Sequence, residues 1–263
     1  MTKWAQALDA YITHLGAAGK APTTVRLKRY QLLHFAKTNP SPFMVARADI
    51  ERALAEPRWS PETRKSYRSA LCGFYRWALN AGLIEDDPTR DLATIHVPRG
   101  VARPCPEALV AELIAHGDAR IALMAMLGAY CGLRAAEIAR LNSRDLVGDE
   151  LTVFGKGGKT RTVPVASPVL MRRLRSVDGW AFPNGLGGHL TPGHVTKLLS
   201  RALPDGWTAH TLRHRMASVS YAATRDLLAV GAVLGHSRPE TTQRYVKLPN
   251  DALRAAVASA SAA

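Results

Sequence analysis

The chain has 263 residues, 47% of them hydrophobic, and a formal net charge of +14, which indicates a globular protein with a polyanionic partner. No apolar run approaches the roughly 18 residues of a membrane span, so a membrane is set aside and nucleic acid is the favoured partner. The cysteines, Cys72, Cys105 and Cys131, lie far apart, which argues against zinc ribbons and disulfide frameworks and favours a reducing cytoplasm.

The first part of the chain, residues 1–95, is predicted to be all-helical. The clearest helix follows Ser60, a typical N-cap, and Pro61, which suits a first helical turn, and its apolar residues recur with helical spacing. A second basic helix follows Pro22. Both helices carry basic side chains off the apolar face, which a solvated surface would also explain. We expect DNA contacts from six of them, namely Arg26, Lys28, Arg29, Arg64, Lys65 and Arg68.

A linker is predicted over residues 96–106, which hold prolines and show no helical periodicity. Beyond it, residues 107–263 are expected to form helices and one β-hairpin, because two β-type runs flank the turn "FGKGGKT". The turn would place Lys156 and Lys159 near its tip. The predicted fold class is therefore mainly α with a small antiparallel β-sheet, in two domains.

A helix boundary is predicted at Gly132. The apolar stretch "ARIALMAMLGAYC" before it is expected to be a core helix that ends at Gly132 in a left-handed conformation. Arg134 and Glu137 then lie three residues apart at the start of a new helix. Such a pair, taken alone, is usually a surface salt bridge of little energetic weight.

The segment "HTLRHRMAS", residues 210–218, allows three interpretations: a metal site, a generic nucleic-acid patch or part of a catalytic centre. On a helix His210, Arg213 and His214 share one face. A metal site would need a further ligand, and Arg213 would repel a divalent cation. We therefore expect no metal, expect His214 to pack in the core, and expect Arg215 to face solvent or DNA.

Residues elsewhere in the chain favour the catalytic interpretation. Direct cleavage of a phosphodiester requires a nucleophile, cations that neutralise the pentavalent phosphate, and a proton donor for the leaving oxygen. The chain offers Arg134 and Arg213 in helix-entry positions, a hairpin lysine, and Tyr245 as nucleophile. Two guanidinium groups can fork onto the phosphate oxygens, and with cations this dense no metal or other cofactor is needed.

The chain resembles the tyrosine recombinase family, also called the phage integrase family, which includes small phage integrases and the Xer recombinases. The resemblance is carried, in family order and at family-like spacing, by "GAYCGLRAAEIARL", "FGKGGKTRTVPV", "HTLRHRMAS" and "VLGHSRPETTQRYV". It implies a helical core-DNA-binding domain with a SAM-like fold over residues 1–95 and a mixed α/β catalytic domain with a C-terminal tail over residues 107–263.

The resemblance also implies roles for single residues. Tyr245 would attack a DNA phosphate and form a 3′-phosphotyrosyl link, and Arg134 and Arg213 would clamp that phosphate. Glu137 would orient Arg134, and His210 would contact the phosphate or act as base. The implied catalytic set is Arg134, Lys156, His210, Arg213, His236 and Tyr245.

The hairpin and the position of His236 complete this set. Lys156 would be the general acid, with Lys159 the less favoured choice, while His236 would support the phosphate or the tyrosine. Lys159 and Arg161 are counted as candidate DNA contacts. The resemblance implies no cofactor and no metal.

The implied activity is that of a site-specific DNA recombinase, or integrase, acting on double-stranded DNA in the cytoplasm of a bacterial host, at the nucleoid. Four protomers, monomeric or weakly associated when free, would form the synaptic complex and pass through a Holliday junction, and a DNA-bending accessory protein is a candidate partner. Because the chain begins directly with the helical part, we expect action at core-type sites only. The expected role is integration or excision of phage or mobile-element DNA.

Three alternatives stay open. The protein could be a Xer-like resolvase of chromosome or plasmid dimers. It could be a site-specific DNA-binding protein without catalysis, which the complete catalytic set argues against. It could be a metal-dependent nuclease, which the lack of an acidic cluster argues against.

Overall fold

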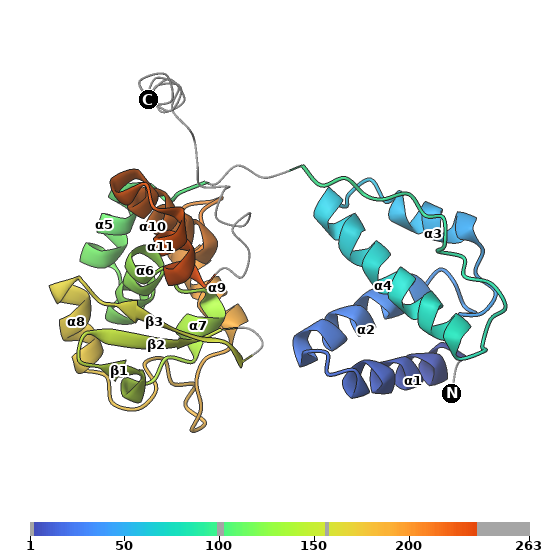
Figure 1. Ribbon diagram of the computed structural model, residues 1–263, viewed down its shortest axis with the longest axis horizontal. Helices are drawn as coiled ribbons and strands as arrows, with labels where there is room; N and C mark the ends of the chain where they lie inside the picture. The colour runs from blue at the N-terminus through green and yellow to red at the C-terminus, as the bar shows by residue number, and fades with distance from the viewer. Residues whose placement is uncertain (1–2, 99–102, 156–157, 236–263) are drawn as a thin grey trace, which may run out of the picture. The chain divides into compact units, whose positions relative to one another are not determined.

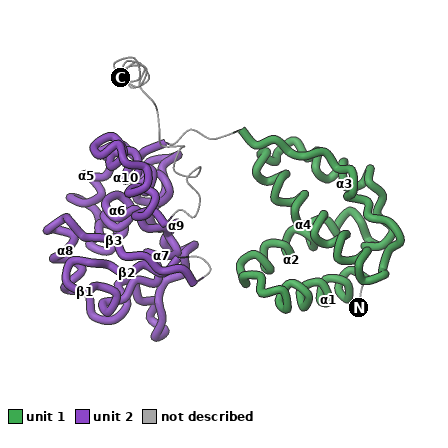
Figure 2. Tube along the Cα trace, in the orientation of Figure 1, with its two compact units in different colours: residues 1–98 green, residues 99–263 purple. Residues whose placement is uncertain are grey.

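The computed structural model describes residues 3–98, 103–155 and 158–235 (Figure 1). The chain divides into two compact units, residues 1–98 and 99–263 (Figure 2). The boundary falls within the segment in which the sequence predicts a linker, and each unit has a hydrophobic core of its own. Among the described residues, no helix has both the length and the apolar character that crossing a membrane requires.

Unit 1 is helical throughout its regular structure. Its core is rich in aromatic side chains: the rings of Trp4 and Phe74 stack with centroids 5.3 Å apart, and Tyr11 meets Phe74 edge-on at 5.4 Å. Such geometries add to the burial of aromatic surface, so they fix the helices firmly against one another. The helices are α1 (Lys3–Ala17), α2 (Pro22–Ala36), α3 (Arg47–Leu54) and α4 (Pro61–Asn80).

Helix α4 confirms the clearest prediction made from the sequence. The Ser60 side chain accepts a hydrogen bond from the Thr63 N–H at 3.2 Å, and Pro61 occupies the first turn. Gly82, with φ +67°, follows the end of the helix. The predicted apolar face is buried, at Tyr67, Ala70, Leu71, Phe74 and Ala78.

Unit 2 combines a small sheet with helices, which confirms the predicted fold class. The sheet is antiparallel with the order β1-β2-β3, formed by Leu146–Val147, Glu150–Phe154 and Thr160–Pro164. The 3₁₀ turn η1 (Ser143–Asp145) precedes it. The helices are α5 (Glu107–His116), α6 (Ala119–Cys131), α7 (Ala135–Ala139), α8 (Pro168–Arg175), α9 (Pro192–Ala202), α10 (Ala209–Thr224) and α11 (Leu227–Leu234).

Helix α6 lies at the centre of unit 2, buried along almost its whole length and packed against α5 and α10. It ends as predicted at Gly132, which has φ +65°. A Cβ at this position would lie 2.8 Å from Cδ2 of Leu234, so the site requires glycine for space as well as for conformation. The tight turn delivers Arg134 directly to the N-cap of α7.

Candidate active site

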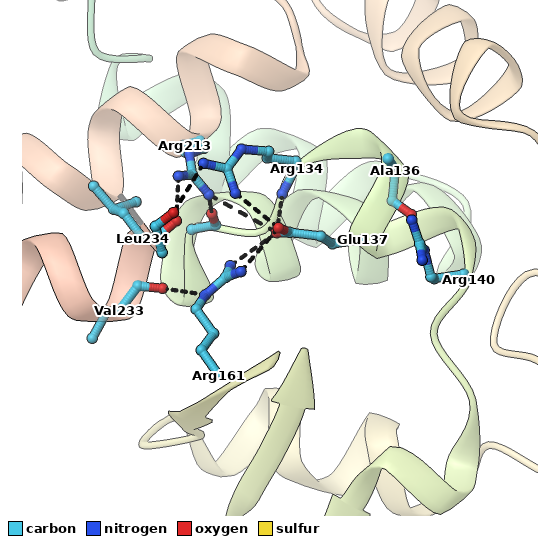
Figure 3. A network of polar contacts seen from close by, with 10 residues as sticks. Arg134, Ala136, Glu137, Arg140, Arg161, Arg213, Val233 and Leu234 are labelled. Atoms are coloured by element: carbon cyan, nitrogen blue, oxygen red, sulfur yellow. Dashed lines mark hydrogen bonds and ion pairs between the residues drawn. The ribbon is translucent and has the colours of Figure 1, made fainter. Parts of the chain in front are cut away.

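A buried carboxylate, Glu137, joins the arginines that the sequence singles out (Figure 3). Its side chain is 2% exposed. Oε1 accepts a hydrogen bond from Nη1 of Arg134 at 2.9 Å, and Oε2 accepts one from the backbone N–H of Arg134 at 2.8 Å. Glu137 is therefore a buried anchor for Arg134, and the interpretation of the pair as an ordinary surface salt bridge is wrong.

Two further arginines face the same carboxylate from other elements. Arg161 of β3 donates from Nη1 to Oε1 and from Nη2 to Oε2, both at 2.9 Å, the forked geometry of a strong charge-assisted pair. Nη1 of Arg213 on α10 lies 3.9 Å from Oε2. These four side chains together carry two net positive charges, a surplus suited to binding a phosphate.

Burial and the neighbouring arginines act in opposite directions on the pKa of Glu137. Burial by itself raises the pKa of the carboxyl, but the hydrogen bonds from Arg161 and from the Arg134 backbone, with the charges of both arginines, bring the pKa below its ordinary value. Glu137 is therefore an anion at neutral pH and holds the arginines by charge as well as by hydrogen bonds.

The C-terminal end of α11 receives the same arginines. The Val233 carbonyl accepts from Nε of Arg161 at 2.6 Å, the Leu234 carbonyl from Nη2 of Arg213 at 2.5 Å, and the Gly235 carbonyl from Nη2 of Arg134 at 3.5 Å. Carbonyls in the last turn of a helix lack intrahelical partners and lie at the negative end of its dipole, so guanidinium groups suit them.

The carbonyl that follows α6 adds a further bond to this cluster. Nη1 of Arg213 donates to the Gly132 carbonyl, and Nη2 to that of Leu234. Both α6 and α11 are followed by a left-handed glycine, Gly132 and Gly235. Arg213 therefore connects its own helix, α10, to the C-terminal ends of α6 and α11.

Helix α10 begins at Ala209, so His210 lies in its first turn and is exposed. His214, one turn further on, is buried as predicted; its Nδ1 accepts the Arg103 N–H at 3.1 Å, and its ring lies 4.2 Å from that of His210. The prediction for Arg215 is wrong. Its side chain is 13% exposed, because it pairs with Glu107 and donates to a carbonyl of α6.

The two candidate DNA-contacting residues of the β-hairpin lie in different surroundings. Lys159 is exposed, whereas the side chain of Arg161 is 11% exposed and is held by Glu137 and Val233. Arg161 therefore lies inside the cluster, where protein oxygens accept from its guanidinium nitrogens. The sequence contained the signal: Arg161 lies opposite Val153 and two residues before Val163, on the buried face of the strand. Lys156, His236 and Tyr245 lie outside the described residues.

The basic residues of unit 1 also fall into two groups. Arg26, Arg29 and Lys65 are exposed on α2 and α4. The other three are half-buried and each donates to a backbone carbonyl: Lys28 to Ser69 at 3.0 Å, Arg64 to Glu56 at 3.2 Å, and Arg68 to Leu92 at 2.8 Å. Burial lowers the pKa of Lys28. These three side chains therefore tie segments of unit 1 together, and their contact with DNA stays a prediction.

Two solved structures share this fold. The lambda integrase dimer bound to a COC' core site, residues 75–356, has this fold, with a TM-score of 0.75 and 18% identity over 93% of this chain and 95% of that one. The XerH recombinase bound to its difH substrate has it too, with a TM-score of 0.65 and 20% identity over 89% and 78%.

Sequence comparison identifies the family. The model of the phage integrase family matches residues 107–251. The tyrosine recombinase XerC of Alcanivorax borkumensis is 33% identical over 92% of this chain and 89% of its own, and XerD of Caulobacter vibrioides is 33% identical over 74% and 73%. The chain belongs to the phage integrase family of tyrosine recombinases, which cleave and rejoin DNA through a tyrosine intermediate.

Proposed function

We propose that the protein recombines DNA at specific sites, with Tyr245 attacking a phosphate held by Arg134 and Arg213. The bond from the tyrosine oxygen to phosphorus forms while His210 takes the proton of the tyrosine hydroxyl, the bond to the 5′ oxygen breaks, and Lys156 gives that oxygen its proton. A 5′-hydroxyl of the partner strand then attacks the phosphotyrosine and releases Tyr245. One ester replaces another in each step, so no external energy source is required.

The shared anchoring of Arg134 and Arg213 is the observation that supports this proposal most strongly. Both bind Glu137, and they donate to the carbonyls of Leu234 and Gly235 at the C-terminal end of α11, the helix that leads in sequence to His236 and Tyr245. A clamp of two guanidinium groups neutralises the pentavalent phosphate, the requirement that dominates phosphoryl transfer. His210 lies three residues before Arg213, at the positive end of the α10 dipole, where an anion is favoured.

We further propose that residues 1–95 bind the core DNA site and that four copies of the chain act together. The exposed basic side chains of α2 and α4, with the net charge of +14, support the DNA contact. The assembly rests on the likeness in fold to a lambda integrase tetramer bound to a Holliday junction, which has a TM-score of 0.73. Any DNA-bending accessory protein belongs to the same proposal.

Covalent capture tests the proposed chemistry. The full chain, in EDTA, is mixed with a randomised duplex library whose members carry a nick, so that a cleaved strand loses a short fragment and cannot religate. DNA attached to protein after denaturation is recovered and sequenced. We expect one enriched site, recovered with the natural chain and absent with Tyr245→Phe. Adduct formation by Tyr245→Phe would refute the nucleophile, and recovery of no adduct from the natural chain would refute the proposal.

The biological role has two candidates, integration or excision of mobile DNA and Xer-like resolution of dimers. The XerC and XerD relatives, matched over most of their length, favour the second. A supercoiled plasmid carrying two directly repeated copies of the captured site separates them. A resolvase is expected to delete the intervening DNA, whereas an integrase that joins two different sites leaves the plasmid intact.

A further inference from the structure

Arg161 differs from Arg134 in how its donors are used. Each of its three guanidinium nitrogens donates to a protein oxygen, at 2.6 Å to Val233 and at 2.9 Å twice to Glu137. Its side chain is 11% exposed, against 42% for Arg134. Arg134 therefore presents a surface that can meet a phosphate, and Arg161 is directed inward.

The forked bond from Arg161 sets the orientation of the Glu137 carboxylate. Because Arg161 donates to both oxygens, the forked bond restrains rotation of the carboxylate, and Arg134 then meets Oε1 in a defined direction. The same guanidinium holds the last turn of α11 through Val233, next to the Leu234 carbonyl that receives Arg213. Arg161 therefore holds in place the groups that position both phosphate-clamping arginines.

The backbone at Gly235 is fitted to this side chain. A Cβ on Gly235 would lie 3.0 Å from Cδ and 3.1 Å from Nη1 of Arg161. The helix end and the arginine are therefore packed in direct contact, besides being hydrogen-bonded. In sequence, Arg161 follows Lys156 by five residues and Val233 precedes His236 by three, so the contact joins the two segments that lead to those residues.

We propose that Arg161 is a positioning residue of the strand-transfer reaction, which acts by holding Glu137 and the end of α11 so that Arg134 and Arg213 meet one phosphate. The inference rests on the proposed function for its reaction. Arg161 does not itself contact DNA. Misplacing a reacting group by about 1 Å can cost about 100-fold in rate, so its loss is expected to act on the rate of cleavage and to leave DNA affinity unchanged.

The test compares Arg161→Met, Arg161→Lys, Glu137→Gln and the double variant Arg161→Met/Glu137→Gln on the duplex obtained by covalent capture. The matched control is Arg140→Ala, because Arg140 lies near the cluster (Figure 3) but donates to the Ala136 carbonyl of α7. Two quantities are measured: the affinity for DNA against salt concentration, and the rate of adduct formation with all DNA bound.

We expect Arg161→Met to slow adduct formation about 100-fold with an unchanged salt dependence of binding, since the salt slope reports phosphate contacts. Arg161→Lys keeps the charge without the fork and should recover part of the rate. The double variant should be no slower than Glu137→Gln alone, because both changes remove one interaction. Arg140→Ala should behave as the natural chain.

The pH profile adds a readout that general loss of structure does not produce. Glu137 faces Arg134 from α7, Arg161 from β3 and Arg213 from α10, and Arg161 contributes most to lowering its pKa against burial. In Arg161→Met the carboxyl should therefore protonate at higher pH, and the acid limb of the rate profile should move up. In the double variant this shift should be absent.

Three results would overturn the inference. A reduced salt slope with a normal rate at saturating DNA would make Arg161 a phosphate contact. Multiplied losses in the double variant would give it a role independent of Glu137. A normal rate in Arg161→Met would leave it no role. Where Arg161→Met does not fold, judged by circular dichroism, Arg161→Lys decides. An inactive natural chain would instead refute the proposed function.

Discussion

The two units of this protein use their charged residues in contrasting ways. In unit 1 the ion pairs lie at the surface: both partners of Arg47–Glu51 are 51% exposed, and water screens them. In unit 2 the carboxylate of Glu137 is 2% exposed and faces three arginines from three elements. The ion pairs of unit 1 thus lie in solvent, whereas the carboxylate of Glu137 in unit 2 is buried and joins several elements of that unit.

Removal of Glu137 should have the largest effect. Glu137→Ala leaves three guanidinium groups close together and partly buried without their anion, which costs about 3–5 kcal/mol in the free energy of unfolding. Urea unfolding of unit 2 measures it, with Glu51→Ala of unit 1 as the control in which no change is expected. Equal effects of the two substitutions would remove the contrast between the units.

The glycines that follow α4 and α6 provide the second comparison. Gly82→Ala and Gly132→Ala both place an alanine at positive φ, which costs about 1–2 kcal/mol. A Cβ at Gly82 meets nothing within 4 Å, whereas one at Gly132 meets Leu234 at 2.8 Å. Gly132→Ala should therefore destabilise the protein more and slow adduct formation as well. Matching losses of stability would mean that the contact with Leu234 relaxes freely.

Within unit 1, substitution of Arg68 should change stability, whereas substitution of Lys65 should change DNA binding. Arg68→Met loses the hydrogen bond to the Leu92 carbonyl, which is worth about 0.5–1.5 kcal/mol, with little change in DNA affinity. Lys65→Ala removes an exposed side chain, so stability should stay the same while the salt slope of DNA binding falls by about 1. Chemical unfolding and salt titration measure the two; the opposite pattern would exchange their roles.

The smallest signal is expected in the pH dependence of stability, because one carboxyl titrates among many. The pKa of Glu137 is lowered in the folded protein, so the unfolded chain binds its proton at higher pH than the folded one. The stability from its charge is thus present at neutral pH and is lost as the pH falls through the acid range. Glu137→Gln should lose less stability on acidification; parallel curves would show that the charge contributes nothing.

Much of the fold could be predicted because its signals are local. The cap at Ser60, the apolar face of α4 and the left-handed Gly132 each depend on residues within a few positions. Strand β1 was missed, since two residues, Leu146–Val147, carry no periodicity. The pairing of Arg134 with Glu137 could be predicted from spacing, but its burial could not, because the strand that covers it is contributed by a distant part of the chain.

The contacts that assemble the cluster were beyond local reasoning. Nothing near Arg213 indicates that its donors meet the carbonyls of Gly132 and Leu234, and nothing near Lys28 or Arg68 indicates that they bind backbone rather than solvent. A basic residue on a helix has the same sequence signature in both cases. The strand alternation around Arg161 is the exception, because the period of two places it on the buried face.

The sequence distances within the arginine cluster bear on the order of folding. The bond from Arg134 to Gly235 spans 101 positions, that from Arg161 to Val233 spans 72, and that from Arg213 to Gly132 spans 81. We expect contacts this distant to form late, after the helices, because closing long loops costs entropy before any contact compensates for it. We therefore expect a chain still emerging from the ribosome to lack the assembled arginine cluster until α11 has docked, so that any activity that depends on the cluster would arrive only with the completed fold.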